Sequence, residues 1–145
     1  VSPSSKLLAL RPDGTGDVTK THVAWTVEEN LPDISSPVSD GNLVFTVTSG
    51  GLLACFDAKD GKKQWEHEFE TEVQASPAIA DGRIYVLGMH GDVFVVGCAR
   101  EFMELSRTKL SDEFSASPAF AEGKVFLRGN KQLWCFGGKG NMVPE

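Results

Sequence analysis

Apolar runs of roughly four to seven residues recur along the whole chain, separated by segments rich in glycine, asparagine and aspartate. The runs are rich in β-branched and aromatic residues, which is typical of strands. Residues 22–27, HVAWTV, alternate polar and apolar positions as a half-buried strand does. No segment keeps a helical period over about ten residues. The pattern therefore predicts an all-β protein.

The apolar runs are part of a repeat with a step of about 41 residues. A Ser-Pro pair recurs at residues 36–37, 76–77 and 117–118, and a turn dipeptide recurs at residues 40–41, 81–82 and 122–123. A period near 40 with four strands in each unit is typical of a β-propeller blade. We therefore predict a partial β-propeller of about three and a half four-stranded antiparallel blades.

The repeat divides this single partial propeller, residues 1–145, into four parts. We expect a half blade at 1–30, complete blades at 31–70 and 71–111, and an incomplete blade without its outer strand at 112–145. The strands are expected at residues 7–10, 22–27, 34–39, 43–48, 52–57, 63–69, 74–80, 83–89, 92–97, 102–109, 115–121, 124–128 and 132–136.

Composition and charge exclude several classes of function. The formal net charge is −6, and the 14 basic residues are scattered rather than gathered into a run, so we expect no nucleic-acid partner. No apolar run reaches the roughly 18–20 residues that span a bilayer, and the first residues form no signal-peptide pattern. The expectation is a soluble chain with no membrane span.

Three cysteines, Cys55, Cys98 and Cys135, stand at spacings that fit no zinc motif, since neither CxxC nor CxxH occurs. Cys55 and Cys135 hold the same place in two repeats, which puts them too far apart for a disulfide. A buried free cysteine behaves as a small apolar residue. We interpret all three as core residues.

The most specific signal lies at residues 55–65, CFDAKDGKKQW. Asp57 is placed to accept backbone N–H bonds across a tight turn, and Gly61 supplies a left-handed φ. Trp65 is expected to pack flat between adjacent blades. Residues 10–14 and Trp25 form a lengthened variant of the same pattern.

This segment resembles the docking motif of the pyrroloquinoline-quinone-like (PQQ-like) propeller family, Ala-x-Asp-x-x-Thr-Gly-x-x-x-Trp. Cys55 replaces the alanine of the motif and Asp60 replaces its threonine. The resemblance implies a structural motif that fastens neighbouring blades and touches no ligand. Its members in this chain are Asp57, Gly61, Trp65 and Trp25.

The resemblance implies two classes of function. Some members of the family are quinoprotein dehydrogenases, which hold the quinone and Ca²⁺ on the propeller axis. Others resemble the outer-membrane assembly lipoprotein BamB, a scaffold that binds peptide strands without a cofactor. By resemblance, the protein is expected in the periplasm or at the cell surface.

A quinone site needs a catalytic aspartate, oxygen ligands for Ca²⁺, an aromatic platform and often an adjacent pair of cysteines. No two cysteines adjoin in this sequence. Asp40 and Asp81 are explained by hairpin turns, and Asn130 stands near another turn. Trp134 is a candidate platform, but on a third strand it is expected in the core.

The histidines and one acidic stretch are the remaining candidates. His22, His67 and His90 show no metal-binding spacing, and His90 is the most informative because it falls at a turn. We interpret all three as satisfied structural or surface residues. The acidic residues 66–72 are interpreted as a solvated outer strand, with a site for a cation or a basic partner as the alternative.

We therefore predict a non-catalytic module that binds or scaffolds proteins or peptides, through its loops or by strand addition at an open blade edge. The alternative is a fragment of a PQQ-dependent quinoprotein dehydrogenase whose catalytic residues lie in missing blades. No catalytic, cofactor-binding or metal-binding residue is assigned, and PQQ and Ca²⁺ are expected only under the alternative.

The partner is expected to be a protein, a peptide or the remaining blades of a longer chain. A homodimer is a further possibility, because the blade faces of a partial propeller need neighbours to bury apolar residues. The residues expected on such faces are Leu8, Phe45, Val86 and Phe126.

Overall fold

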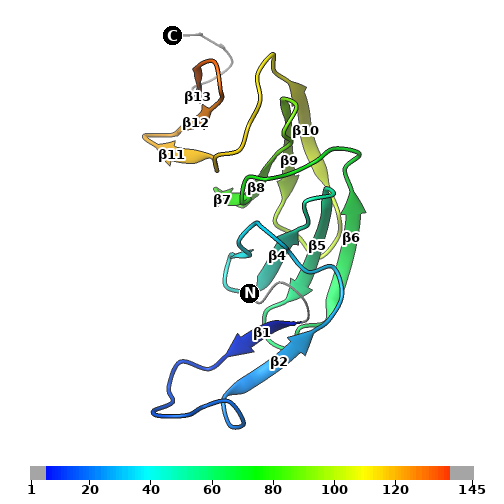
Figure 1. The fold of residues 1–145 in the computed structure, drawn as a ribbon, viewed down its shortest axis with the longest axis vertical. Helices are drawn as coiled ribbons and strands as arrows, with labels where there is room; N and C mark the ends of the chain where they lie inside the picture. Colours follow the sequence, from blue (N-terminus) through cyan, green and yellow to red (C-terminus); the bar gives the residue numbers. More distant parts are fainter. Residues whose placement is uncertain (1–5, 138–145) are drawn as a thin grey trace.

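The computed structural model describes residues 6–137, and over this range the chain forms four antiparallel sheets and no helix (Figure 1). The prediction of an all-β chain is confirmed. The described residues accordingly include no helix that could cross a membrane. The sheets contain β1 (Leu7–Leu10) and β2 (Val23–Val27); β3 (Val38–Ser39), β4 (Leu43–Val47), β5 (Leu52–Asp57) and β6 (Lys63–Glu68); β7 (Ala78–Ala80), β8 (Arg83–Leu87), β9 (Asp92–Gly97) and β10 (Glu104–Lys109); and β11 (Ala119–Ala121), β12 (Lys124–Arg128) and β13 (Leu133–Gly137).

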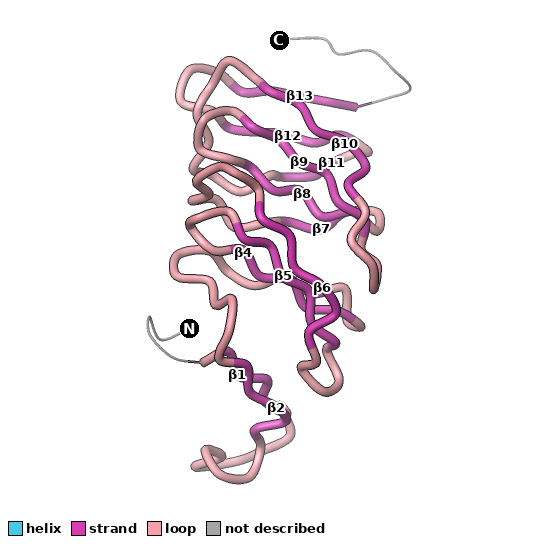
Figure 2. The backbone as a smooth tube through the Cα atoms, turned by 90° about the vertical axis from the view of Figure 1, so that its right-hand side faces the viewer, coloured by secondary structure: helices cyan, strands magenta, loops and turns pink. Residues whose placement is uncertain are grey.

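Each sheet is a meander in which consecutive strands pair antiparallel. Figure 2 shows the four sheets stacked one on another in chain order, from β1 and β2 at one end to β11–β13 at the other. The second and third sheets have four strands, whereas the first has two and the last has three. Within the last three sheets the connections are shorter than those that lead from one sheet to the next, whereas a long segment joins β1 to β2 in the first sheet.

The first strand of each blade is shorter than predicted. Strands were expected over 34–39, 74–80 and 115–121, but β3, β7 and β11 have only two or three residues. Each observed strand begins directly after a proline, which has no N–H to donate to a ladder. In the second sheet the preceding polar groups bond elsewhere, because Ser35 Oγ donates to the Val47 carbonyl and the Ser36 N–H donates to Ser76 Oγ.

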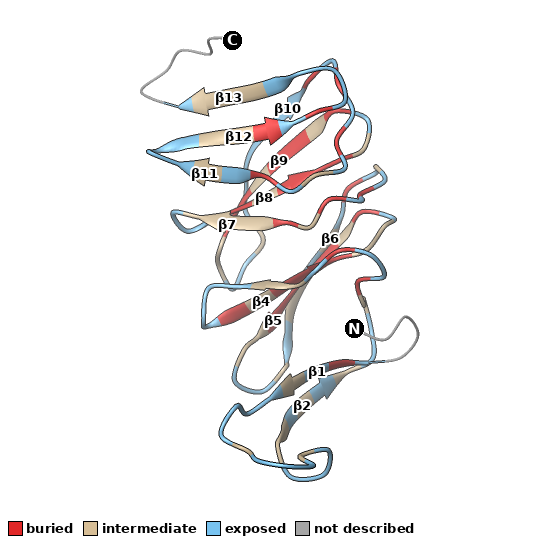
Figure 3. Cartoon of the chain, turned by 60° about the vertical axis from the view of Figure 1, so that its left-hand side comes forward, coloured by how far each residue is buried: buried red, intermediate tan, exposed pale blue. Residues whose placement is uncertain are grey.

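The largest apolar cluster lies between the second and third sheets. Phe45 and Val86 are fully buried there, and Phe69 stacks on Phe94 with ring centroids 4.1 Å apart. A second cluster, around Leu87 and Leu127, joins the third sheet to the last. Successive residues of β8 alternate between the two clusters, which the two-residue period of a strand requires. Figure 3 shows the buried positions concentrated in the middle of the stack.

Four residues, Leu8, Phe45, Val86 and Phe126, were expected on open apolar faces, and two of them are fully buried. Phe45 and Val86 have no exposed surface, because the neighbouring sheet of the same chain covers them. Leu8 in the first sheet is 48% exposed, and Phe126 in the last sheet is half-buried. Of these four residues, only the two in the end sheets keep apolar surface open.

Replacing Phe69 by alanine should lower the free energy of unfolding by about 3–5 kcal/mol, because the substitution opens a cavity between two sheets. Leu105→Ala is the matched control. That side chain is 46% exposed on β10, and its loss should cost less than about 0.5 kcal/mol. Urea denaturation of both variants measures the difference, and equal midpoints would contradict the assignment of Phe69 to the core.

Candidate functional site

Trp25 joins the first sheet to the second. Its indole Nε1–H donates to the carbonyl of Ala58, 2.8 Å away, in the turn between β5 and β6. The ring also lies against Gly61 in that turn. Gly61 has a φ of +72°, and a Cβ on it would come within 2.7 Å of the indole. Both the left-handed backbone and the close approach of the ring therefore require glycine.

Trp65 repeats this contact between the second and third sheets. Its Nε1–H donates to the carbonyl of Ala99, 2.9 Å away, in the turn between β9 and β10. The ring lies between Phe45 of its own sheet and Phe102 of the next. It is tilted at 44° to Phe45 and meets Phe102 edge-on at 72°, so it does not pack flat as expected. Edge-on contact is a favoured aromatic geometry.

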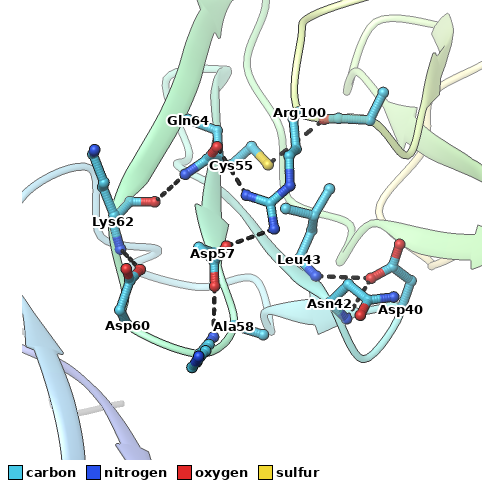
Figure 4. Close-up of polar contacts among 12 residues, drawn as sticks. Asp40, Asn42, Leu43, Cys55, Asp57, Ala58, Asp60, Lys62, Gln64 and Arg100 are labelled. Carbon is cyan, nitrogen blue, oxygen red and sulfur yellow. Dashed lines mark hydrogen bonds and ion pairs between the residues drawn. The ribbon is translucent and has the colours of Figure 1, made fainter.

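Asp57 links the same two sheets through its carboxylate (Figure 4). One oxygen accepts the N–H of Lys59 at 2.8 Å, inside the predicted turn. The other lies 2.6 Å from the guanidinium of Arg100, which also donates to Gln64. The Lys59 N–H and then the guanidinium lower the pKa of Asp57. No role was predicted for Arg100, because it stands in the turn where the repeat motif is lost.

The cysteines are free thiols. Cys55 is fully buried, and burial raises its pKa to about 12. Cys98 is half-buried at the edge of the same cluster, and burial raises its pKa to about 11. Cys135 is half-buried on β13. Protonated thiols in apolar surroundings are poor nucleophiles, so Cys55 and Cys98 contribute packing rather than chemistry.

The aspartates and the asparagine weighed for a quinone site are used by the turns that contain them. Asp40 Oδ1 accepts the N–H groups of Asn42 and Leu43 (Figure 4). Asp81 has a φ of +50° in the hairpin turn before β8. Asn130 donates its side-chain N–H to Glu113. These positions belong to different sheets, so they do not form one cluster.

The histidines and the acidic stretch serve local structure. His67 stacks on Phe102 with centroids 3.9 Å apart. His22 shares a hydrogen bond with Thr21, and its Nε2 lies 3.5 Å from Asp13. In the acidic stretch Glu66 pairs with Lys63 at 2.9 Å. Within residues 6–137, no three acidic, histidine or cysteine side chains gather where they would hold a metal ion.

Asp112 is a buried carboxylate that sequence reasoning did not single out. It is 4% exposed and accepts hydrogen bonds from the N–H groups of Glu113, Lys131 and Gln132 and from the indole N–H of Trp134. Burial opposes ionisation, but these four donors hold its pKa down to about 2. Trp134, expected in the core, is half-buried and packs on the second cluster while donating to Asp112.

A shallow groove of about 460 Å³ runs beside this carboxylate, and His90 lies on its wall. The Asp112 oxygens are already engaged by the chain itself, and they fasten the last sheet to the segment that leaves the third. The groove therefore marks a structural junction.

Within residues 6–137, β13 forms an edge of the last sheet. β13 pairs with β12 on one side, and no described strand pairs with it on the other. The corresponding third strands of the complete sheets, β5 and β9, pair on both sides. An edge of this kind presents backbone N–H and C=O groups that another strand can bind.

Comparison with known proteins places these features in a family. Residues 15–101, more than half of the chain, match the family described as outer membrane protein assembly factor BamB. Quinoprotein alcohol dehydrogenase PedE of Pseudomonas putida and the quinoprotein ethanol dehydrogenase of Pseudomonas aeruginosa are each 34% identical over 73 residues. That match covers 48% of this chain and 12% of each dehydrogenase.

Solved structures show the same fold. BamB from Moraxella catarrhalis superposes with a TM-score of 0.67 at 18% identity, over 79% of this chain and 36% of that one. Quinohemoprotein alcohol dehydrogenase ADHIIG from Pseudomonas putida HK5 superposes with a TM-score of 0.63 at 15% identity, over 79% of this chain and 20% of that one. The predicted partial propeller and the PQQ-like resemblance are confirmed.

Gly61→Ala should destabilise the chain by about 1–2 kcal/mol for the left-handed φ and by about 1–3 kcal/mol more for the clash with Trp25. Gly41→Ala is the matched control. Gly41 also has a positive φ, +95°, but an added Cβ there meets nothing within 4 Å. Thermal unfolding should rank the loss at Gly61 above that at Gly41, and equal losses would show that the Trp25 contact is unimportant.

Asp112→Asn should remove a pH dependence of stability between about pH 4 and pH 2. The pKa of Asp112 in the folded chain, about 2, lies below its ordinary value of 3.8, so the unfolded chain binds more protons over this range. The stabilisation is complete above the ordinary value and is lost as the pH falls through the folded value. Melting temperatures of both proteins from pH 7 to pH 2 test this, and parallel curves would contradict it.

Proposed function

Because the chain belongs to the family described as outer membrane protein assembly factor BamB, we propose that it is a non-catalytic propeller module that binds a protein or peptide segment. The segment binds in extended form as an added strand on the open edge of β13. The observation that carries the proposal is the pairing of this strand on one side only among the described residues. Strand addition at a free edge is a common mode of peptide recognition.

The complete sheets show what an added strand would look like. β6 and β10 occupy the corresponding place, run antiparallel to β5 and β9, and have six residues each. Both strands are polar on their outer side, and all six residues of β10 are exposed. A ligand for β13 would therefore be a short extended segment with polar residues on its outer side. Main-chain hydrogen bonds supply affinity in this mode, and side-chain pockets supply specificity.

The use of polar side chains supports a binding module rather than an enzyme. Asp57 and Asp112 accept hydrogen bonds from the chain's own backbone, and Asp57 also pairs with Arg100. Each carboxylate fastens one sheet to the next. Asp57 and Asp112 thus serve the structure of the stack.

A quinoprotein dehydrogenase fragment is the second candidate, favoured by the 34% identity to two such enzymes over 73 residues. The described residues offer no cluster of ligands for Ca²⁺, so this function requires residues outside the described part of the protein. The two candidates separate on addition of PQQ with Ca²⁺. Only a quinone site would change the quinone absorbance and raise the melting temperature.

The family description concerns the assembly of outer membrane proteins, and we infer from it a periplasmic or cell-surface location and an extended protein segment as the class of ligand. The remaining blades of a longer chain, or a second copy, would compete for the same edge. Light scattering detects the second copy, because a dimer has twice the 15.7 kDa of this chain.

The proposal predicts that a peptide with the sequence of residues 61–69, which contains β6, binds β13. Amide hydrogen exchange of residues 133–137 should slow at alternate positions, since alternate backbone groups of a strand point to each edge. The exchange rates are measured by NMR with and without the peptide. A scrambled peptide is the first control.

Two N-methylated peptides provide the second control. One lacks the N–H groups of even positions and the other lacks those of odd positions, so only one of them should lose binding. No protection at residues 133–137, or equal protection by the scrambled peptide, would overturn strand addition.

A further inference from the structure

Two contacts between sheets contain an indole ring from the outer strand of the earlier sheet, and the third contact has no indole at that position. Trp25 lies between the first and second sheets, and Trp65 lies between the second and third. In each case the indole N–H donates to a turn carbonyl of the following sheet. The contact between the third sheet and the last is different.

The pairing registers identify the corresponding residue. In the second sheet Phe45 pairs with Cys55, and Cys55 pairs with Trp65. These three residues form a row across the sheet and face the same neighbour, because directly paired residues share one side. Trp65 is thus the outer member of a row that points at the third sheet.

The third sheet has the same row with a different outer member. Tyr85 pairs with Val95, and Val95 pairs with Ser106. The row lies about 41 residues further along the chain, which is the period of the repeat. Ser106 therefore stands where the preceding blade has Trp65, and it points at the last sheet.

A groove lies where the indole is missing. It has a volume of about 330 Å³ and runs between the third sheet and the last. Tyr85, Val95 and Ser106 form one wall. Val125 and Phe136, from the last sheet, line the other side.

The chemistry of the lining fits an aromatic ring. Val95 and Phe136 offer apolar surface, while Ser106, Thr108 and Arg83 add polar groups at the wall. A mostly apolar pocket with a few polar groups is typical of a ligand site, and 330 Å³ lies at the lower end of the usual range. A ring buried here would contact both sheets, as Trp65 does one blade earlier.

We propose that this groove, which we call the Ser106 groove, binds an aromatic side chain of the segment that the module recognises. This inference rests on the proposed function, because it assigns the bound segment an aromatic residue. Phe136 and Gly137 at the end of β13 line the groove, so a segment paired with β13 has the groove beside it. The ring takes the place that an indole of the chain takes in the other two contacts.

The first test uses N-acetyl-tryptophanamide and the whole chain. Its addition should shift the amide resonances of Ser106, Tyr85 and Val125 in a saturable way. Ser106→Trp fills the groove with the chain's own indole, so it should abolish these shifts and raise the urea midpoint. Ser106→Phe provides the same test if the tryptophan variant folds poorly.

Leu105→Trp is the matched control. This residue is next to Ser106 on β10, is 46% exposed and does not line the groove, so binding should be unchanged. Undiminished binding to Ser106→Trp, or no binding to the unmodified chain, would overturn the proposal. Binding that arises only after deletion of residues 138–145 would also overturn it, because the chain would then fill the groove itself.

The second test separates the groove from the strand edge. The peptide of residues 61–69 is made without aromatic residues, and a single tryptophan is then placed at each position in turn. One position should bind about tenfold more tightly than the others, and Ser106→Trp should remove that gain. If the peptides protect residues 133–137 but no tryptophan position binds more tightly than the others, the proposal for the groove is overturned. Strand addition would still hold. Free N-acetyl-tryptophanamide bound without any such protection would support the groove and overturn strand addition.

Discussion

The sheets of this chain are apolar on two sides, and only a neighbouring sheet can remove both sides from water. β8 and β9 send alternate residues into the two core clusters, so the third sheet is buried from both directions. Burial of this kind makes stability a sum of contacts between neighbours, as in other repeat proteins. It also determines what happens at the ends of the stack, where Leu8 and Leu133 stay about half exposed because no described sheet covers them.

Directional contacts then fix how the sheets sit on one another. Apolar burial alone has little preference for a particular alignment, whereas a hydrogen bond has a defined geometry. The indole N–H groups of Trp25 and Trp65 each reach a turn carbonyl of the next sheet, and the Arg100 guanidinium reaches back to Asp57. In the last blade this role falls to Asp112, whose single carboxylate accepts hydrogen bonds from four donors.

Much of this architecture could be predicted from the sequence because it depends on local patterns. The two-residue period gave the strands, and the 41-residue step gave the blades. The first strands were predicted too long, since the pattern of apolar residues does not show that Ser35 and Ser36 bond to other groups. Arg100 and Asp112 were missed because their roles depend on partners brought close by folding, which no motif marks.

The Ser106 groove could have been found by counting from Trp65, yet its meaning depends on the registers that the structure supplies. A residue that follows the repeat motif is used in the contact between blades, so its side chain is not available to bind a ligand. Where a residue differs from the repeat motif, surface that the motif residue would bury stays exposed. Ser106 leaves a groove, and the last sheet leaves the edge of β13 unpaired among the described residues. These two departures lie side by side, because Phe136 and Gly137 of β13 also line the groove. A single extended segment can therefore satisfy the backbone of β13 and fill the space left by the missing indole.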